Sequence, residues 1–188
     1  GPTAGLVTSE AGDSASFTVV LENLPQSDVI LLLTSTRPGE GSPSPDTLTF
    51  TSANWNQPQD VIVHGADDSR VDGPQSYQIT LHPAFSADPH YSGRVGAPVG
   101  VTNNDNDIAG ITVTPTAGLV TTEAGGTATF AMSLDSQPDS NVVIPISSSS
   151  SGEGTVAPTR LTFTALNWNA PQTITLTGVN DFSVDGDQ

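Results

Sequence analysis

The chain repeats itself at an offset of 113 residues, and this repeat limits the available folds more than any other feature. Residues 2–8 and 115–121 both read Pro-Thr-Ala-Gly-Leu-Val-Thr, and the match runs without a gap until Gln75 pairs with Gln188. About half of the aligned positions are identical. A fixed internal period marks tandem copies of one structural unit. We therefore predict a first copy over residues 1–108 and a second copy over residues 109–188.

Each copy is predicted to consist of β-strands. Residues 15–21 alternate between apolar and small or polar side chains, which is the period of a half-buried strand. Residues 28–34 form a nearly continuous apolar run, which is typical of a strand in a sandwich core. Further strands are predicted at residues 47–50, 60–64, 76–81, 97–102 and 111–113, with a long turn-rich loop over residues 82–96. The pattern predicts an all-β fold of tandem immunoglobulin-like Greek-key β-sandwiches.

The two copies differ at their ends. Gly1 aligns with Thr114, so the first copy has no counterpart of the strand predicted at residues 111–113. The second copy has no counterpart of residues 76–107, which contain two predicted strands, and is expected to be incomplete. A sandwich without two strands exposes core residues and strand edges. Two explanations stay open: the sequence is a segment of a longer array, or another chain supplies the missing strands.

The chain is strongly acidic. It carries 20 acidic side chains against four basic ones, all arginine, and its net charge is −16. Because phosphate groups are bound by basic residues, we expect no nucleic-acid partner and no anionic membrane surface as a partner. The longest apolar run, residues 29–33, is far too short to span a bilayer, so no membrane insertion is expected. The alternative explanation of the charge is solubility of an extracellular or salt-adapted protein.

The acidic residues gather in loops that a sandwich can bring to one end. In the first copy these carboxylates are Glu10, Asp67, Asp68, Asp72, Asp105 and Asp107. Together they can supply the six to eight oxygen ligands that calcium takes. The chain has no cysteine, so a hard cation that binds oxygen is favoured, calcium before magnesium. The alternative for residues 67–72 is a solvated turn, in which turn geometry favours aspartate.

Four motifs occur in a fixed order along the first copy. They are Ser-Glu-Ala-Gly at 9–12, Leu-Thr-Phe at 48–50, Asp-Asp-x-x-x-Asp-Gly at 67–73 and Asn-Asp-Asn-Asp at 104–107. In this order they resemble the Calx-beta family, and most of all its repeats in large bacterial surface and secreted proteins. The resemblance covers the whole first copy and the existing part of the second. It implies a calcium-binding immunoglobulin-like sandwich, with ions at the end that faces the next domain.

The resemblance also implies a ligand set. In the first copy it comprises the six carboxylates already named, and in the second copy Glu123, Asp181, Asp185 and Asp187. Two positions depart from the family pattern: the Asp-Tyr pair of the mid-repeat loop is missing, with Glu40 as a candidate substitute, and Asp67 becomes Asn180. One or two calcium ions per copy are therefore expected.

These features predict a non-catalytic protein, because no nucleophile, base and orienting acid recur as a set. We expect a calcium-stiffened spacer in a bacterial surface adhesin, filament or extracellular matrix protein, located outside the cell or at its surface. Its partners would be neighbouring repeats of the same chain or of like chains. One alternative is a module that binds a glycan or cell-surface ligand through Trp55, Trp168 or residues 82–96. Another is a filament subunit completed by strand donation from a neighbouring chain.

Overall fold

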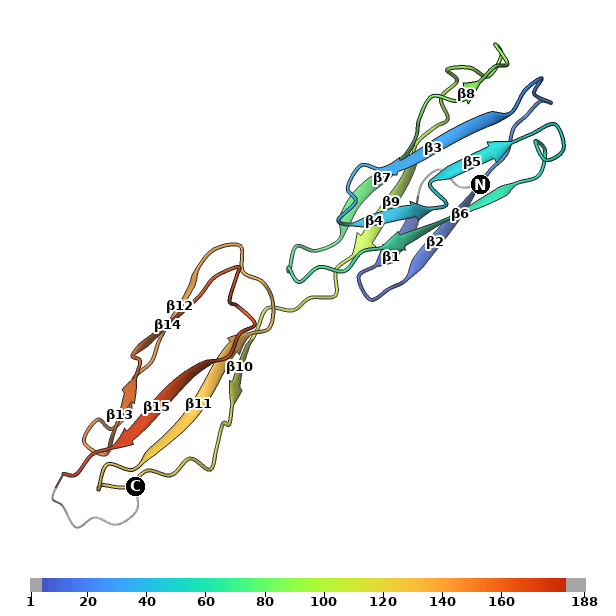
Figure 1. Ribbon diagram of the computed structural model, residues 1–188. Coiled ribbons are helices and arrows are strands. Elements are labelled where there is room, and N and C mark those ends of the chain that lie inside the picture. Colours follow the sequence, from blue (N-terminus) through green and yellow to red (C-terminus); the bar gives the residue numbers. More distant parts are fainter. Residues whose placement is uncertain (1–4, 182–188) are drawn as a thin grey trace. The chain divides into compact units, whose positions relative to one another are not determined.

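The computed structural model describes residues 5–181, and every regular element in that range is a β-strand (Figure 1). The all-β class predicted from the sequence is therefore confirmed. Within residues 5–181 there is no helix that could serve as a membrane span. The chain divides into two compact units, the first running to Asn106 and the second beginning at Asp107, except that residues 69–71 group with the second.

The first unit is a sandwich of two sheets. One sheet has the strand order β1-β9-β7-β3-β5 with β8 beside β3, and the other has the order β2-β6-β4. The strands are β1 (Leu6–Ser9), β2 (Ser14–Val19), β3 (Val29–Ser35), β4 (Gly41–Ser44), β5 (Thr47–Phe50), β6 (Gln59–Gly65), β7 (Gln75–Leu81), β8 (Phe85–Ser86) and β9 (Val99–Asn104). The pair β1 and β9 is parallel, and the other pairs of this unit are antiparallel.

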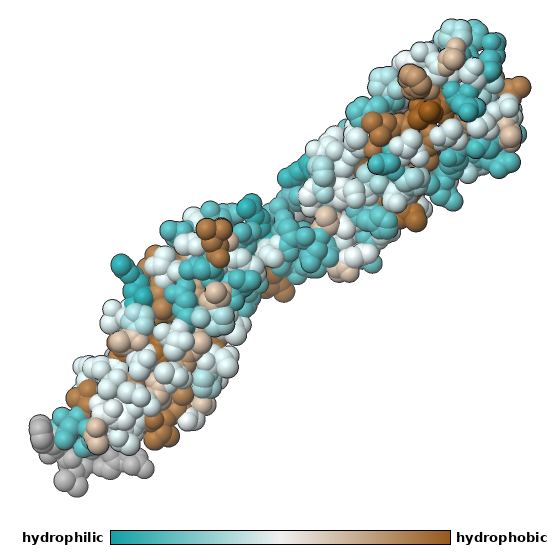
Figure 2. Space-filling view, viewed as in Figure 1, coloured by the Kyte–Doolittle hydropathy of each residue, from teal (hydrophilic) through white to brown (hydrophobic). Residues whose placement is uncertain are grey.

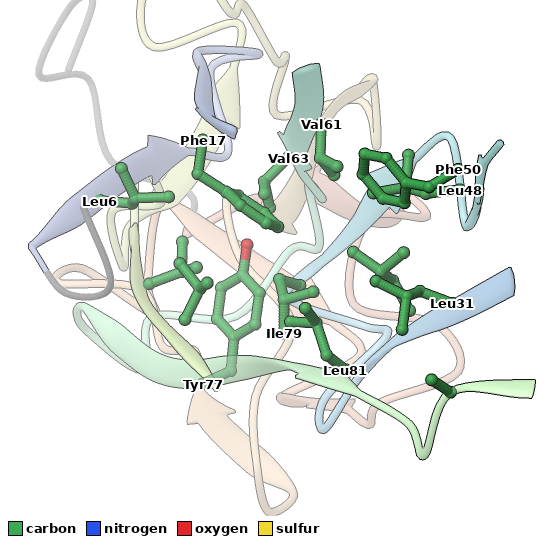
Figure 3. Packing of buried hydrophobic residues seen from close by; sticks show 14 of the residues in the cluster. Leu6, Phe17, Leu31, Leu48, Phe50, Val61, Val63, Tyr77, Ile79 and Leu81 are labelled. Atoms are coloured by element: carbon green, nitrogen blue, oxygen red, sulfur yellow. The ribbon is translucent and has the colours of Figure 1, made fainter. Parts of the chain in front are cut away.

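The core of the first unit lies between its two sheets. Figure 3 shows Tyr77, Ile79 and Leu81 of β7 pointing toward Phe17 of β2 and Val63 of β6. All five side chains are at most 6% exposed. Burial alternates along β7 because successive side chains of a strand point to opposite faces of the sheet. The alternating apolar residues of both sheets therefore meet in one continuous cluster.

The β3 strand differs from its sequence-based prediction. The apolar run predicted a strand wholly within the core, whereas Val29, Leu31 and Leu33 are buried and Ile30 and Leu32 are 37% and 46% exposed. The outer face of this sheet meets solvent. Every second residue of β3 is therefore exposed, even where its side chain is apolar. Figure 2 shows hydrophobic residues at the surface over β3, toward the end where β8 lies.

The second unit contains six strands within the described residues. They are β10 (Ile111–Thr114), β11 (Thr127–Leu134), β12 (Val142–Pro145), β13 (Gly154–Ala157), β14 (Arg160–Phe163) and β15 (Gln172–Gly178). One sheet has the order β10-β11-β15-β13, and β12 pairs with β14 in another. By the 113-residue offset, β11-β15-β13 corresponds to β2-β6-β4 of the first unit, and β10 is an added edge strand.

The tryptophan-containing turn has the same geometry in both units. Asn54 Oδ1 accepts the Thr51 amide at 2.6 Å, and its counterpart Asn167 Oδ1 accepts the Thr164 amide at 2.6 Å. Trp168 is half-buried and packs against the core cluster of the second unit. The same hydrogen bond therefore holds the turn in both units.

The short strands β4 and β8 were not predicted from the sequence. The strand β4 contains Pro43, which favours no strand, and it lies at the edge of its sheet, where proline is tolerated. The strand β8 interrupts the predicted loop over residues 82–96. Within the same loop Asp88 is only 2% exposed, so this segment is packed rather than loosely solvated.

Candidate metal site

The parallel pairing of β1 and β9 brings carboxylates from the two ends of the first copy together. Ser9 lies opposite Asn104 in this register, so both strands leave the sheet at the same edge. Glu10 follows β1 directly, while Asp105 and Asp107 follow β9. The Glu10 amide donates to the Asn104 carbonyl oxygen at 3.0 Å. One strand pair thus brings together residues that lie 95 positions apart in the sequence.

The three carboxylates form a compact group. One ligand oxygen from each of Glu10, Asp105 and Asp107 lies within 4.8 Å of the other two. Glu10 is only 6% exposed, and both aspartates are half-buried. Removing like charges from water raises the cost of holding them together. A cation among these oxygens would offset that cost, and oxygen-only donors suit calcium or magnesium.

Backbone amides orient two of the carboxylates. The Asn106 amide donates to Glu10 Oε2 at 3.2 Å, and the Gly73 amide donates to Asp105 Oδ2 at 2.7 Å. Gly73 has a φ of +70°, a conformation that side chains rarely adopt, so glycine suits this position. The second bond also ties the acidic loop to the group. The local fold therefore sets the direction of the carboxylates before any ion binds.

Buried polar residues hold the start of the same loop. Asn103 is 1% exposed, and its Nδ2 donates to the Ala66 carbonyl oxygen at 2.9 Å. The Thr8 hydroxyl donates to Asn103 Oδ1 at 2.8 Å. Position 65 must be glycine, because a Cβ there would collide with the Ser9 carbonyl oxygen. The loop over residues 66–73 is thus anchored at both ends beside the carboxylates.

The structure separates the six predicted ligands of the first copy into two sets. Glu10, Asp105 and Asp107 converge, whereas Asp67, Asp68 and Asp72 are exposed and lie outside the group of three. The reason is that the first three lie next to paired strands, while the others lie in the open part of the loop. This division could not be predicted from spacing alone, since all six residues lie in connecting segments.

Glu40 also lies outside the group. Its carboxylate is 3.8 Å from Arg37, its side chain is largely buried, and its main-chain oxygen accepts the Ala66 amide at 3.0 Å. Its counterpart Glu153 makes the same main-chain bond to the Val179 amide at 2.9 Å. At this position both units therefore share a main-chain hydrogen bond, and this bond holds the start of the acidic loop.

No corresponding group forms in the described part of the second unit. Glu123 and Asp181 are exposed, and Asp185 and Asp187 lie outside the described residues. Residues 119–122, which align with β1, form no strand. The counterpart of β9 would begin beyond residue 188 of this sequence. Among the residues that the structure describes, no second segment of carboxylates lies beside Glu123.

Comparisons with known proteins give likenesses of structure only. No family model and no curated protein matches the sequence. The chain is similar to the calcium binding domain CBD12 of CALX1.1, with 17% identity and a TM-score of 0.37, over 94% of this chain and 73% of that one. It is also similar to the periplasmic chaperone SfaE, with 11% identity and a TM-score of 0.43, over 100% of this chain and 95% of that one. A third similar structure is that of SSP-19 of Caenorhabditis elegans, an MSP-domain protein like family member. Its identity is 13% and its TM-score 0.37, over 53% of this chain and 92% of that one. These values carry no argument for a function.

Proposed function

We propose that this protein is a calcium-binding structural repeat of the Calx-beta kind, and that it acts without catalysis. The observation that carries the proposal is the convergence of Glu10, Asp105 and Asp107 at the end of the first sandwich. Acidic motifs with the order typical of Calx-beta repeats support it. In this proposal the three carboxylates hold calcium, and the ion fixes the segment that leaves β9.

The charge balance explains why calcium would matter to the fold. Three carboxylates within 4.8 Å repel one another, and Glu10 is largely removed from water. A divalent cation turns this repulsion into attraction, and three carboxylates can offer up to six oxygens. The chain has no cysteine, so a thiolate site for zinc is excluded. The exposed Asp67, Asp68 and Asp72 raise the local negative potential and attract cations to this end of the unit.

An extracellular location is part of the proposal, and it sets the calcium affinity to expect. Calcium sites of extracellular modules have dissociation constants of about 0.1–1 mM. At a calcium concentration about 100 times the dissociation constant, one site adds roughly 2.7 kcal/mol to the free energy of unfolding. That is a large share of the stability of a small domain, which is about 5–15 kcal/mol. We therefore propose a calcium-stiffened spacer of a bacterial surface or secreted protein, whose partners are neighbouring repeats.

Calorimetry and thermal unfolding test the proposal with matched variants. The full chain is first treated with a chelator and then titrated with Ca²⁺. We expect heat of binding and a rise in the melting temperature of the first unit of about 4–8 °C for each kcal/mol gained. Asp105→Asn removes one ligand charge and should abolish most of both effects. Asp28→Asn removes an exposed charge outside the group and should change neither.

The result that would overturn the proposal is equally direct. If millimolar Ca²⁺ gives no heat and no change in melting temperature, the group does not hold calcium and the proposal is wrong. A response that survives Asp105→Asn in full would place the ion elsewhere in the chain. Mg²⁺ at the same concentration serves as the comparison ion, and it should bind more weakly because it demands regular octahedral geometry.

A further inference from the structure

The loop between β6 and β7 contains a dipeptide that can rearrange without any enzyme. Asp72 is followed by Gly73, and Asp72 is exposed in a part of the loop without regular structure. The carboxyl group of an aspartate can react with the main-chain nitrogen of the next residue. Glycine in that next position leaves the nitrogen unshielded, because it has no Cβ. The sequence of this loop alone therefore favours isomerisation of the aspartate.

The reaction conserves the atoms of the chain. The Gly73 nitrogen bonds to Cγ of Asp72, and its hydrogen leaves as water together with the hydroxyl group of the protonated side-chain carboxyl. The product is a succinimide ring. When water opens this ring at the former main-chain carbonyl carbon, the chain continues through Cβ and Cγ as isoaspartate. The main chain is then longer by one carbon atom, and the remaining carboxylate is attached to Cα.

The fold holds the attacking nitrogen in place. The Gly73 amide donates to Asp105 Oδ2 at 2.7 Å, although Asp105 lies 32 residues further along the chain, directly after β9. The nitrogen can reach Cγ of Asp72 only if the planar peptide unit rotates. That rotation breaks the bond to Asp105, and hydrogen bonds to a charged acceptor are among the stronger ones. The folded first unit therefore opposes the first step of the reaction.

The carbonyl side of the same peptide unit is held as well. Gln75 Nε2 donates to the Asp72 carbonyl oxygen at 2.8 Å. Arg37 Nη1 donates to Gln75 Oε1 at 2.6 Å, which orients the amide group of Gln75. Because the peptide unit is planar, hydrogen bonds at both its oxygen and its N–H group fix its rotation. The bond between Asp72 and Gly73 is thus clamped on both sides.

We propose that the Asp72–Gly73 bond is a latent isomerisation site, which Asp105 and Gln75 keep closed in the folded first unit. Asp105 is the main clamp, because its carboxylate is a charged acceptor, whereas the bond from Gln75 joins neutral groups. Loss of the Asp105 bond opens the site to isomerisation, and the added carbon atom then shifts Gly73 away from Asp105. The inference rests on hydrogen bonds of the loop and does not depend on calcium.

Timed incubation of the full chain in a chelator tests the proposal. Isoaspartate at residue 72 is measured by chromatography and fragmentation of proteolytic peptides, which also separate it from the same Val-Asp-Gly sequence at 184–186. A synthetic peptide of residues 66–80 gives the rate for the unclamped bond. We expect Asp72 to isomerise about tenfold or more slowly in the folded chain than in the peptide, because opening must first break a hydrogen bond to a charged group.

Four variants assign the clamp. Asp105→Ala removes the acceptor, so the rate at Asp72 should rise about tenfold or more, toward that of the peptide. Asp105→Asn keeps an acceptor oxygen without the charge and should give an intermediate rate. Gln75→Ala frees the Asp72 carbonyl oxygen and should raise the rate by less than Asp105→Ala does. Asp28→Asn changes an exposed charge outside this loop and should leave the rate unchanged.

Two results would overturn the proposal. Equal rates in the folded chain and in the peptide would show that the fold does not protect the bond. A rate in Asp105→Ala that is unchanged or slower than in the wild-type chain would show that Asp105 is not the clamp. Thermal unfolding in the same buffer checks that each variant is folded at the temperature of incubation. If Asp105→Ala is unfolded there, Asp105→Asn and Gln75→Ala decide, and wild-type rates in both would refute the proposal.

Discussion

The first and second units share about half of their aligned residues, yet they bury their hydrophobic residues to very different extents. Within the described residues, the core cluster contains fifteen buried hydrophobic residues in the first unit and four in the second. Seven of the fifteen belong to β1, β7, β9 or the segment over residues 82–96, which have no formed counterpart in the second unit. Phe17 is 3% exposed, whereas its counterpart Phe130 is only half-buried.

This difference shows that the burial of a residue depends on the strands that pack around it and not on the residue type alone. Phe50 and Phe163 lie in the half of the repeat that both units form, and both are fully buried. Val63 is also fully buried, but its counterpart Leu176 is half-buried, because the described residues form no sheet like β1-β9-β7 to cover it. In the part of the second unit that the structure describes, there is neither a strand pair like β1 and β9 nor a group of three carboxylates. Core and candidate site therefore depend on one feature of the fold, the pairing of β1 with β9.

The largest expected effect on stability comes from truncating the side chains at two equivalent core positions. Phe50→Ala should cost the first unit about 3–5 kcal/mol and shift a transition that stays cooperative. Phe163→Ala should abolish a cooperative transition in the second unit, because only three other hydrophobic residues are buried in its described part. Denaturant unfolding measures each unit by tryptophan fluorescence, with Trp168→Phe leaving Trp55 as the reporter and Trp55→Phe leaving Trp168.

Phe85→Ala is the matched control for the core variants, since Phe85 is 76% exposed. It should change the free energy of unfolding by less than about 0.5 kcal/mol. Equal, fully cooperative shifts for Phe50→Ala and Phe163→Ala would contradict the difference drawn between the two cores.

A smaller and equal effect is expected where the units agree. Asn54→Ala and Asn167→Ala each remove the acceptor of a partly buried turn amide, which lies 2.6 Å from the asparagine Oδ1. Each should lower the stability of its own unit by about 1 kcal/mol, because the turn amide loses its partner. Chemical denaturation of the two variants checks this, and a twofold or larger difference between them would show that the turns are not equivalent. Asn56→Ala, at an exposed position of the same turn, provides the control.

The smallest effect appears only in acid and only in the first unit. Asp88 accepts the Gln26 amide at 2.7 Å and the His90 amide at 2.9 Å, and these bonds lower the pKa of its carboxyl group. The stabilisation is present above the unfolded-state pKa of about 3.9 and is lost as the pH falls through the folded-state value. Thermal unfolding from pH 6 to pH 2 should show a steeper loss of stability for the wild-type chain than for Asp88→Asn. Parallel curves would refute the assignment.

Much of the architecture was predictable because it depends on local patterns. The period of two along residues 15–21 and 76–81 predicted strands that the structure contains with shifts of one or two residues. The offset of 113 residues also relates Asn-Trp-Asn at 54–56 to the same three residues at 167–169, and the turn has the same hydrogen bond in both units. By contrast, the strand β4 and the short β8 carry no such pattern, since Pro43 in β4 argues against a strand. Both form because neighbouring strands offer an edge, which sequence periodicity does not describe.

The sequence by itself determined the all-β class, the duplication and the types of side chain that can meet a cation. Only the tertiary structure decided which carboxylates converge. Glu10, Asp105 and Asp107 lie together, whereas the exposed aspartates of the acidic loop lie outside this group. The physical reason is that strand periodicity is a property of neighbouring residues, whereas convergence requires a strand pair that joins residues 6–9 to residues 101–104. A spacing in sequence sets which side chains share a face, but only the parallel pairing places both strand ends at one edge.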